Sequence, residues 1–482
     1  MIRKYISDII TPDEISKWKS GDRILIHSQT GSGKSEFIKN NLYDHCVLND
    51  KKILLLSNRN LLKNQNLIDI EDKLDYIDAL NYQQLEAKVI GGFSPTELFS
   101  PYDYIVYDEA HYMFADSSFN RNTDLLLEPV KNTPDDKILI FITATPDALL
   151  DYQPEYSYKY NLQQDYSYIK NIYFYNRLST IESIIKNIPY NEKVIYFGSN
   201  AQQTWEESIK FKDSTFICSV SNKLHNKSDQ NTIKQIVREC RFDSRLLFAT
   251  KLLDNGVNIK DHEIKHIIID MLDPISFIQC LGRKRYLIED DNITLYIKNY
   301  HGGKIYYVLS DINSKLKFIV DFNELPEKDF INKYRKENFD GLIDNDMKIN
   351  WAKYQYYLTQ KRLLENMFLD QEKIGYKKYI CKLLDFDTSK IKSADQEFET
   401  LSMRKLLRKY VGIKMFKDDR EKFKILFFNN IFTPKKTDYI ARGIKAIGGI
   451  LEENRLRFEI HSRQETKGSN RNKTYWIIEK EI

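Results

Sequence analysis

The chain has 482 residues, of which 42% are hydrophobic and 29% charged, and its formal net charge is +4 at pH 7. This composition excludes collagen-like and low-complexity proteins, and the length indicates about three domains at roughly 150 residues each. No run of about 18 apolar residues occurs, so we expect no membrane partner. The five cysteines form no closely spaced pair, which favours a reducing, cytoplasmic setting.

The first strong feature is a short apolar run, Ile24–Ile26, which predicts a buried strand. It leads into a glycine-rich segment made of Thr30, Gly31, Ser32, Gly33, Lys34 and Ser35. A helix-compatible stretch follows at Glu36–Asn41, and strand, glycine turn and helix together are typical of a phosphate-binding loop. Glycines let backbone N–H groups face anionic oxygens, Lys34 adds a full charge, and the Ser35 hydroxyl can bind Mg²⁺. Ser28 stands where the pattern usually begins with glycine, and an ordinary turn is the alternative.

The first 300 residues alternate apolar runs with stretches long enough for crossover helices. After the first strand, the next expected strands are Ile53–Ser57, Tyr76–Leu80, Tyr104–Tyr107 and Ile138–Thr143. We interpret the polar stretch Asp151–Tyr168 as a join between two domains. The strands expected beyond it are Ile172–Tyr175, Val194–Gly198, Thr215–Val220, Leu246–Thr250, Ile267–Asp270 and Ile293–Ile297. This alternation predicts two parallel sheets, each with ligand sites at the carboxyl ends of its strands.

The last third of the chain is predicted to be mainly helical. Gly302-Gly303 marks a break, and Pro326–Phe428 has an aromatic, helix-like pattern. A helix expected over Lys436–Leu456 precedes two strands, Phe458–Ser462 and Thr474–Ile478, which form a hairpin.

The positive charge of the chain is concentrated in this last third. From Arg404 to Lys424 there are nine Lys and Arg residues against three Asp and Glu residues. The turn of the hairpin is also basic, with Arg463, Lys467, Arg471 and Lys473. We interpret the helix and hairpin as a winged-helix-like module that binds nucleic acid. The alternative is an ordinary capping hairpin beside a solvated helix face.

Two adjacent carboxylates follow a predicted strand. The strand at Tyr104–Tyr107 runs directly into Asp108-Glu109-Ala110-His111. Because the carboxyl ends of parallel strands meet at one edge of a sheet, Asp108 is expected to hold Mg²⁺ beside Ser35. Glu109 is then placed to polarise a water molecule for attack on a nucleoside triphosphate.

From Arg23 to Arg285, six segments resemble, in order, the motifs of superfamily 2 DEAD/DEAH-box helicases, as found in bacterial or phage-type members. The resemblance implies an ATP hydrolase that uses ATP and Mg²⁺ and that consists of two RecA-like lobes facing one triphosphate. In that family, His111 couples the nucleotide state to nucleic acid, and an arginine of the later lobe acts on the γ-phosphate. Arg283 fits this role best, and Arg285 is the alternative.

The resemblance also assigns residues outside the catalytic group. Gly256 would lie near the nucleotide. The coupling residues would be Thr143, Thr145 and Gln279, together with His111. The contacts with the nucleic-acid backbone would be Arg59, Gln83, Ser199 and Thr250. Lys251 and Asn255 stand where many members carry Asp and Arg, which argues against the strict RNA-helicase group.

The predicted fold is therefore α/β, with two tandem RecA-like parallel-sheet domains followed by a mainly helical region that ends in a helix and a β-hairpin. The expected domains are residues 1–160, 161–310, 311–430 and 431–482. The expected function is an ATP-dependent helicase or translocase on nucleic acid, with DNA favoured over RNA. One alternative is a non-unwinding DNA-dependent ATPase or remodelling subunit, and the other is a DNA-binding initiator. Either would act in mobile-element replication or defence, with replication or defence proteins as partners.

Overall fold

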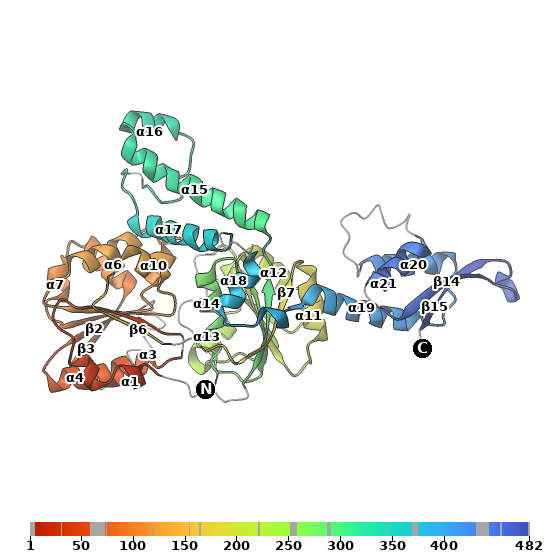
Figure 1. Ribbon diagram of the computed structural model, residues 1–482, viewed down its shortest axis with the longest axis horizontal. Helices are drawn as coiled ribbons and strands as arrows, with labels where there is room; N and C mark the ends of the chain where they lie inside the picture. The colour runs from red at the N-terminus through yellow and green to blue at the C-terminus, as the bar shows by residue number, and fades with distance from the viewer. Residues whose placement is uncertain are drawn as a thin grey trace. The chain divides into compact units, whose positions relative to one another are not determined.

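The computed structural model of the protein (Figure 1) divides into two compact units. The first contains residues 1–170, 193–293 and 300–388, and the second contains residues 171–192, 294–299 and 389–482. The residues that the structure describes are 5–29, 31–57, 73, 75–118, 120–153, 155–162, 165–219, 222–250, 258–286, 291–344, 346–368, 375–429, 443–453 and 456–480.

The first unit begins with a six-stranded sheet, which with its helices we call the first lobe. Its strands are β1 (Arg23–His27), β2 (Ile53–Ser57), β3 (Ile77–Asn81), β4 (Tyr104–Asp108), β5 (Ile138–Thr143) and β6 (Tyr158–Asn161). They lie in the order β3-β2-β4-β5-β1-β6, and every neighbouring pair is parallel. Strands β2 and β5 are buried throughout, as expected for a sheet covered on both faces.

Helices cover both faces of this sheet (Figure 1). On one face lie α1 (Ile6–Ile9), α3 (Lys34–Glu36) and α4 (Tyr43–Leu48), and on the other lie α6 (Tyr82–Ile90), α7 (Pro95–Phe99) and α10 (Asp147–Tyr152). The shorter elements are α2 (Pro12–Ile15), α8 (Tyr112–Ala115), α9 (Leu127–Asn132), η1 (Phe37–Leu42), η3 (Asp116–Ser118) and η4 (Thr123–Leu126). The helix predicted after the glycine loop is present as the continuous run α3–η1–α4.

The prediction that residues 151–168 only join two domains is wrong for part of that stretch. Residues 158–161 form β6, which pairs with β1 along the edge of the sheet. Its side chains alternate between half-buried and exposed, so no continuous apolar run marks it as a strand. Tyr160 lies on the half-buried side, where its hydroxyl accepts a hydrogen bond from the Trp18 indole (3.0 Å).

A second parallel sheet follows in the same unit, and with its helices we call it the second lobe. Its strands are β8 (Lys193–Gly198), β9 (Ser214–Ile217), β10 (Leu246–Ala249) and β11 (Ile264–Asp270), in the order β11-β8-β10-β9. Its helices are α12 (Ala201–Ser208), η5 (His225–Lys227), α13 (Gln230–Glu239) and α14 (Pro274–Leu281). The prediction of two parallel α/β sheets is confirmed.

The described part of the first unit also contains the helices α15 (Gly302–Glu324), α16 (Glu327–Lys333), α17 (Trp351–Asn366) and α18 (Gly375–Leu383). The helical region thus begins at the glycine pair that we took for a break, not at Pro326. Glycines are tolerated in the first turn of a helix, where backbone N–H groups have no intrahelical partner. The buried residues Ile305, Ile312, Leu316 and Ile319 have helical spacing, and this pattern could have revealed α15.

The second unit contains β7 (Ile169–Tyr175), β12 (Ile293–Lys298) and β13 (Lys392–Ser393), in the order β13-β7-β12, with helix α11 (Ser179–Asn187). Its remaining elements are α19 (Ala394–Tyr410), α20 (Lys417–Asn429), α21 (Ile444–Glu453), β14 (Phe458–Gln464) and β15 (Thr474–Lys480). Strands β14 and β15 form an antiparallel hairpin whose inner face shares an apolar core with the three helices.

The hairpin and the helical C-terminal region agree with the prediction. The helix expected over residues 436–456 is confirmed over residues 444–453, and residues 431–442 lie outside the described part. Helices α15–α18 belong to the first unit, and α19 and α20 belong to the second. The four domain ranges stay a prediction. Among the described residues, no helix has the length and apolar character that a membrane crossing requires.

Candidate nucleotide site

The glycine loop after β1 has the backbone geometry of an anion cradle. Gly31 and Gly33 adopt φ angles of 83° and 84°, in the left-handed region that favours glycine. A β-carbon on Gly33 would lie 3.3 Å from the Tyr5 ring, so this glycine is also needed for close packing. The loop is fixed at both ends, because the Ser28 N–H donates to the Thr143 carbonyl (2.9 Å) and the Ser32 carbonyl accepts from the N–H of Ile6 (3.0 Å).

Lys34 and Glu109 form an ion pair across this loop. The Lys34 Nζ lies 3.0 Å from Glu109 Oε1, and the two side chains are only 8% and 13% exposed. Glu109 follows β4 directly and has a φ of 50°, which is uncommon for a residue with a side chain. Its N–H donates to the Asp108 carboxylate (3.0 Å), and the Tyr82 hydroxyl donates to the Asp108 carbonyl (2.8 Å). The two carboxylates are therefore held at the carboxyl edge of the sheet, beside the loop.

The surroundings of these carboxylates separate their pKa values. Burial and the neighbouring charge of Glu109 raise the pKa of Asp108. Burial also opposes ionisation of Glu109, but the positive charges of Lys34 and Arg283 outweigh it and lower the pKa of Glu109. Burial lowers the pKa of His111 to about 4, so this imidazole is neutral at pH 7. Asp108 and the Ser35 hydroxyl line the same cavity and offer the oxygen ligands that Mg²⁺ prefers, and the charge of such a cation would favour the ionised Asp108 carboxylate.

A chain of hydrogen bonds connects the first lobe to the second. His111 Nδ1 lies 3.0 Å from Thr143 Oγ1, which also accepts from the N–H of Thr145 (3.1 Å). The Gln279 amide of α14 donates to Thr145 Oγ1 (3.2 Å), and the Arg283 guanidinium donates to Gln279 Oε1 (3.0 Å). All four residues predicted to couple the site to nucleic acid therefore lie in one connected series that ends at the predicted arginine.

A cavity of about 340 Å³ lies between the two lobes. From the first lobe it is lined by Gly31, Gly33, Lys34, Ser35, Asp108 and Glu109, and from the second by Arg283 and Arg285. Arg283 is 1% exposed, and the Arg285 Nε donates to Asn258 Oδ1 (2.7 Å). Both arginines that the sequence offered thus face the cavity that contains Lys34.

The cavity has further lining residues that sequence reasoning missed, namely Tyr5, Glu36, Asn258, Lys260 and Tyr286. Tyr5 precedes the first predicted strand, and no motif points to it. Tyr286 directly follows Arg285 in the chain. In the structure its ring stacks on Tyr168 with the centroids 3.5 Å apart.

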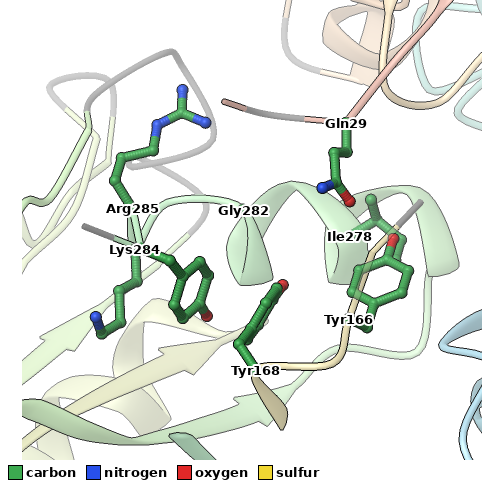
Figure 2. A pocket seen from close by; sticks show the side chains of 8 residues that line it. Gln29, Tyr166, Tyr168, Ile278, Gly282, Lys284 and Arg285 are labelled. Carbon is green, nitrogen blue, oxygen red and sulfur yellow. The ribbon is translucent and has the colours of Figure 1, made fainter. Parts of the chain in front are cut away.

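A second, much smaller cavity of about 20 Å³ lies next to this pair (Figure 2). It is lined by Gln29, which directly precedes the glycine loop, and by Tyr166, Tyr168 and Arg285. The Gln29 side-chain carbonyl accepts a hydrogen bond from the N–H of Asp165 (3.0 Å). The segment that leaves the first lobe is therefore tied to the start of the glycine loop.

The residues predicted to contact nucleic acid are only partly described. Ser199 and Thr250 follow the adjacent strands β8 and β10, so both lie at the carboxyl edge of the second sheet. Gln83 lies on α6, where its amide donates to the Tyr112 hydroxyl. Thr30, Arg59 and Gly256 lie outside the described residues. Among those described, no group of three or more His, Cys, Asp or Glu side chains has the geometry of a metal site.

Lys34→Ala is expected to weaken binding of Mg²⁺-ATP at least tenfold. The substitution removes the one lysine charge of the glycine loop and the ion pair with Glu109, so phosphate oxygens would meet a carboxylate charge that Lys34 no longer balances. The dissociation constant of a fluorescent ATP analogue measures the effect. Lys52→Ala, at an exposed lysine of the same lobe, is the control. Equal affinity of the Lys34→Ala protein and the wild type would contradict the assignment.

Comparison with solved structures finds distant similarity. RNA- and ADP–BeF₃-bound Dbp5 of S. cerevisiae is 16% identical, with a TM-score of 0.43, and the match covers 61% of this chain and 83% of Dbp5. The DEAH/RHA helicase HrpB of Escherichia coli is 12% identical, with a TM-score of 0.44, and the match covers 96% of this chain and 64% of HrpB. No curated protein matches the chain.

The comparison with protein families is more specific. Residues 10–151 match the family model described as DEAD/DEAH box helicase. This range contains the glycine loop, the adjacent carboxylates and the Thr143–Thr145 segment, which are three of the elements that line or connect the cavity. The resemblance to the DEAD/DEAH-box helicases that the motifs predicted is thus confirmed for this part of the chain.

Proposed function

We propose that the protein is an ATP-dependent nucleic-acid helicase or translocase, in which the cavity between the two lobes holds ATP and Mg²⁺. One observation carries the proposal: Lys34 and Glu109 of the first lobe line the same cavity as Arg283 of the second. Phosphoryl transfer needs charge neutralisation around the γ-phosphate and an oriented nucleophile, and these three side chains supply both.

In this proposal each residue has a separate role. Lys34 and the loop N–H groups bind the β- and γ-phosphates. Ser35 and Asp108 would hold Mg²⁺, which would neutralise charge on the phosphate oxygens. Glu109, ionised at neutral pH, accepts a hydrogen bond from the attacking water and orients it. Arg283 stabilises the charge that develops on the γ-phosphate, as a planar and permanently charged guanidinium can.

The hydrogen-bonded series from His111 to Arg283 supports a coupling of hydrolysis to movement. Loss of the γ-phosphate removes the ligand that Lys34 and Arg283 share, and this changes the preference of the two lobes for a closed cleft. With nucleic acid bound along the carboxyl edges, near Ser199 and Thr250, each cycle would shift one lobe along the strand. Because such contacts are made to the sugar-phosphate backbone, we expect the affinity for nucleic acid to depend little on base sequence and strongly on salt concentration.

We further propose that the hairpin of the second unit binds the nucleic acid, with DNA favoured. Lys467, Arg471 and Lys473 are exposed around its turn. Their joint replacement by Ala is expected to lower DNA affinity at least tenfold and to make the plot of log K against log salt shallower, by about 0.7–0.9 per lost phosphate contact. Replacing the exposed Lys19, Lys52 and Lys212 is the charge-matched control. An unchanged salt slope would favour the alternative of a capping hairpin.

A fluorescent duplex with a single-stranded tail tests the function itself. Strand release that requires ATP and Mg²⁺ is expected for a helicase. ATP turnover that a polynucleotide stimulates, without strand release, would instead support the non-unwinding ATPase or remodelling subunit. Absence of turnover with single-stranded DNA, duplex DNA and RNA would contradict both.

A further inference from the structure

Helix α17 hydrogen-bonds to both lobes, although no motif of the nucleotide site lies on it. Its N-terminus is seated on the first lobe: the Asn350 side chain donates to the Arg121 carbonyl (3.0 Å), and the N–H of Ala352 donates to the Asp124 carboxylate (3.2 Å). Asp340, in the connection between α16 and α17, links α17 to α15, because it accepts from the Tyr357 hydroxyl (2.6 Å) and pairs with Lys315 of α15 (3.1 Å). Helix α17 is thus fixed along its length, not loosely attached.

The second half of α17 contacts helix α10 of the first lobe. The Thr359 hydroxyl donates to Asp151 (2.8 Å), and the Arg362 guanidinium donates to Asp151 (3.0 Å) and Asp147 (3.1 Å). Helix α10 begins immediately after the segment that contains Thr143 and Thr145. Figure 1 shows α17 lying alongside α10.

The same part of α17 also contacts the start of helix α14 in the second lobe. The Gln360 amide donates to Asp273 Oδ1 (2.9 Å). Asp273 is the N-cap of α14 and accepts from the N–H groups of Ile275 and Ser276 (3.0 and 3.2 Å). Helix α14 carries Gln279 and leads to Arg283. Arg362 thus binds the helix that follows Thr145, and Gln360 binds the helix that carries Gln279, the hydrogen-bond partner of Thr145.

We propose that α17 is a strut that sets the separation of α10 and α14, and that Arg362 and Gln360 are positioning residues for the ATP hydrolysis proposed above. Neither side chain lines the nucleotide cavity. They act on it through α10 and α14, by keeping Gln279 within reach of Thr145 and Arg283 in the cavity. The Arg362 ion pairs are part-exposed, so they contribute little to folding, and their effect is expected in the geometry between the lobes.

Arg362→Ala is expected to lower the polynucleotide-stimulated kcat for ATP at least tenfold, while the dissociation constant of a fluorescent ATP analogue changes less than twofold. Arg362→Lys, which keeps a cation within reach of Asp147 and Asp151, is expected to restore most of the turnover. Lys361→Ala is the matched control, since the carboxylate near Lys361 is Glu365 of α17 itself (3.9 Å). Turnover within twofold of wild type for Arg362→Ala would overturn the proposal.

A distance measurement tests the strut apart from the enzymatic activity. Spin labels on cysteines placed at the exposed positions 52 and 212, with the half-exposed Cys240 replaced by Ser, report the separation of the lobes. In the full chain, Arg362→Ala is expected to broaden the distance distribution and Lys361→Ala to leave it unchanged. Equal distributions would refute the strut. A wild-type protein without ATP turnover would refute the proposed function, and the distance measurement would still decide on the strut.

Discussion

Glu109→Gln is expected to lower ATP turnover at least a hundredfold while ATP still binds. The Glu109 carboxylate faces the cavity beside Lys34, and its neighbours keep it ionised. The amide has the same shape but cannot accept a proton from water, and loss of such a group typically costs 10²–10⁴-fold in rate. Release of the Lys34 ion pair also leaves the lysine free for phosphate, so affinity for ATP is expected to be equal or higher.

Steady-state phosphate release measures ATP turnover, and the dissociation constant of an ATP analogue measures ATP affinity. The matched control is Glu86→Gln, at a buried carboxylate of α6 that accepts hydrogen bonds from the Asn120 amide (2.8 and 3.0 Å), outside the cavity. Wild-type turnover of the Glu109→Gln protein in the presence of DNA and RNA would show that another group orients the water.

Arg283→Ala is expected to lower turnover about a thousandfold or more, the scale on which an arginine finger acts in phosphoryl transfer. Two effects combine, because the substitution removes the guanidinium from the cavity and also the hydrogen bond to Gln279. Arg283→Lys should recover only part of the rate, since an ammonium group cannot make two parallel hydrogen bonds to a phosphate.

The same measurement on Arg285→Ala decides between the two arginines. Arg285 also lines the cavity, but its Nε donates to Asn258, so we expect a smaller loss of turnover. The result that contradicts our assignment is full activity of Arg283→Ala together with an inactive Arg285→Ala. In that case Arg283 would serve only to hold Gln279.

Several parts of the site could be predicted from the sequence because their chemistry depends on neighbouring residues. The glycine loop needs left-handed angles at Gly31 and Gly33, which local residue choice reveals, and the family match confirms this part of the chain. The two carboxylates follow a strand of branched and aromatic residues. The apolar runs of both sheets are likewise local patterns, and both sheets are present.

The contacts that escaped prediction join residues far apart in the chain. Tyr5 lines the nucleotide cavity because α1 packs on the loop, and no pattern around Tyr5 indicates this packing. The side chains of strand β6 alternate only between half-buried and exposed, and this pattern is too weak to reveal a strand without its partner β1. The roles of Gln360 and Arg362 depend on acidic residues some 90 and 210 positions earlier, at the start of α14 and within α10. In each case the residues come together only in the folded chain, so no local sequence pattern indicates the contact.

ATP turnover by wild type, Lys34→Ala, Arg283→Ala and the double variant, each with single-stranded DNA, duplex DNA and RNA, tests the central claim most directly. If one triphosphate meets both side chains, either single substitution removes nearly all stimulated turnover, and the double variant loses little more, as expected for residues that act together. Two independent, multiplicative losses, or wild-type turnover in the Arg283→Ala protein, would contradict a single shared site.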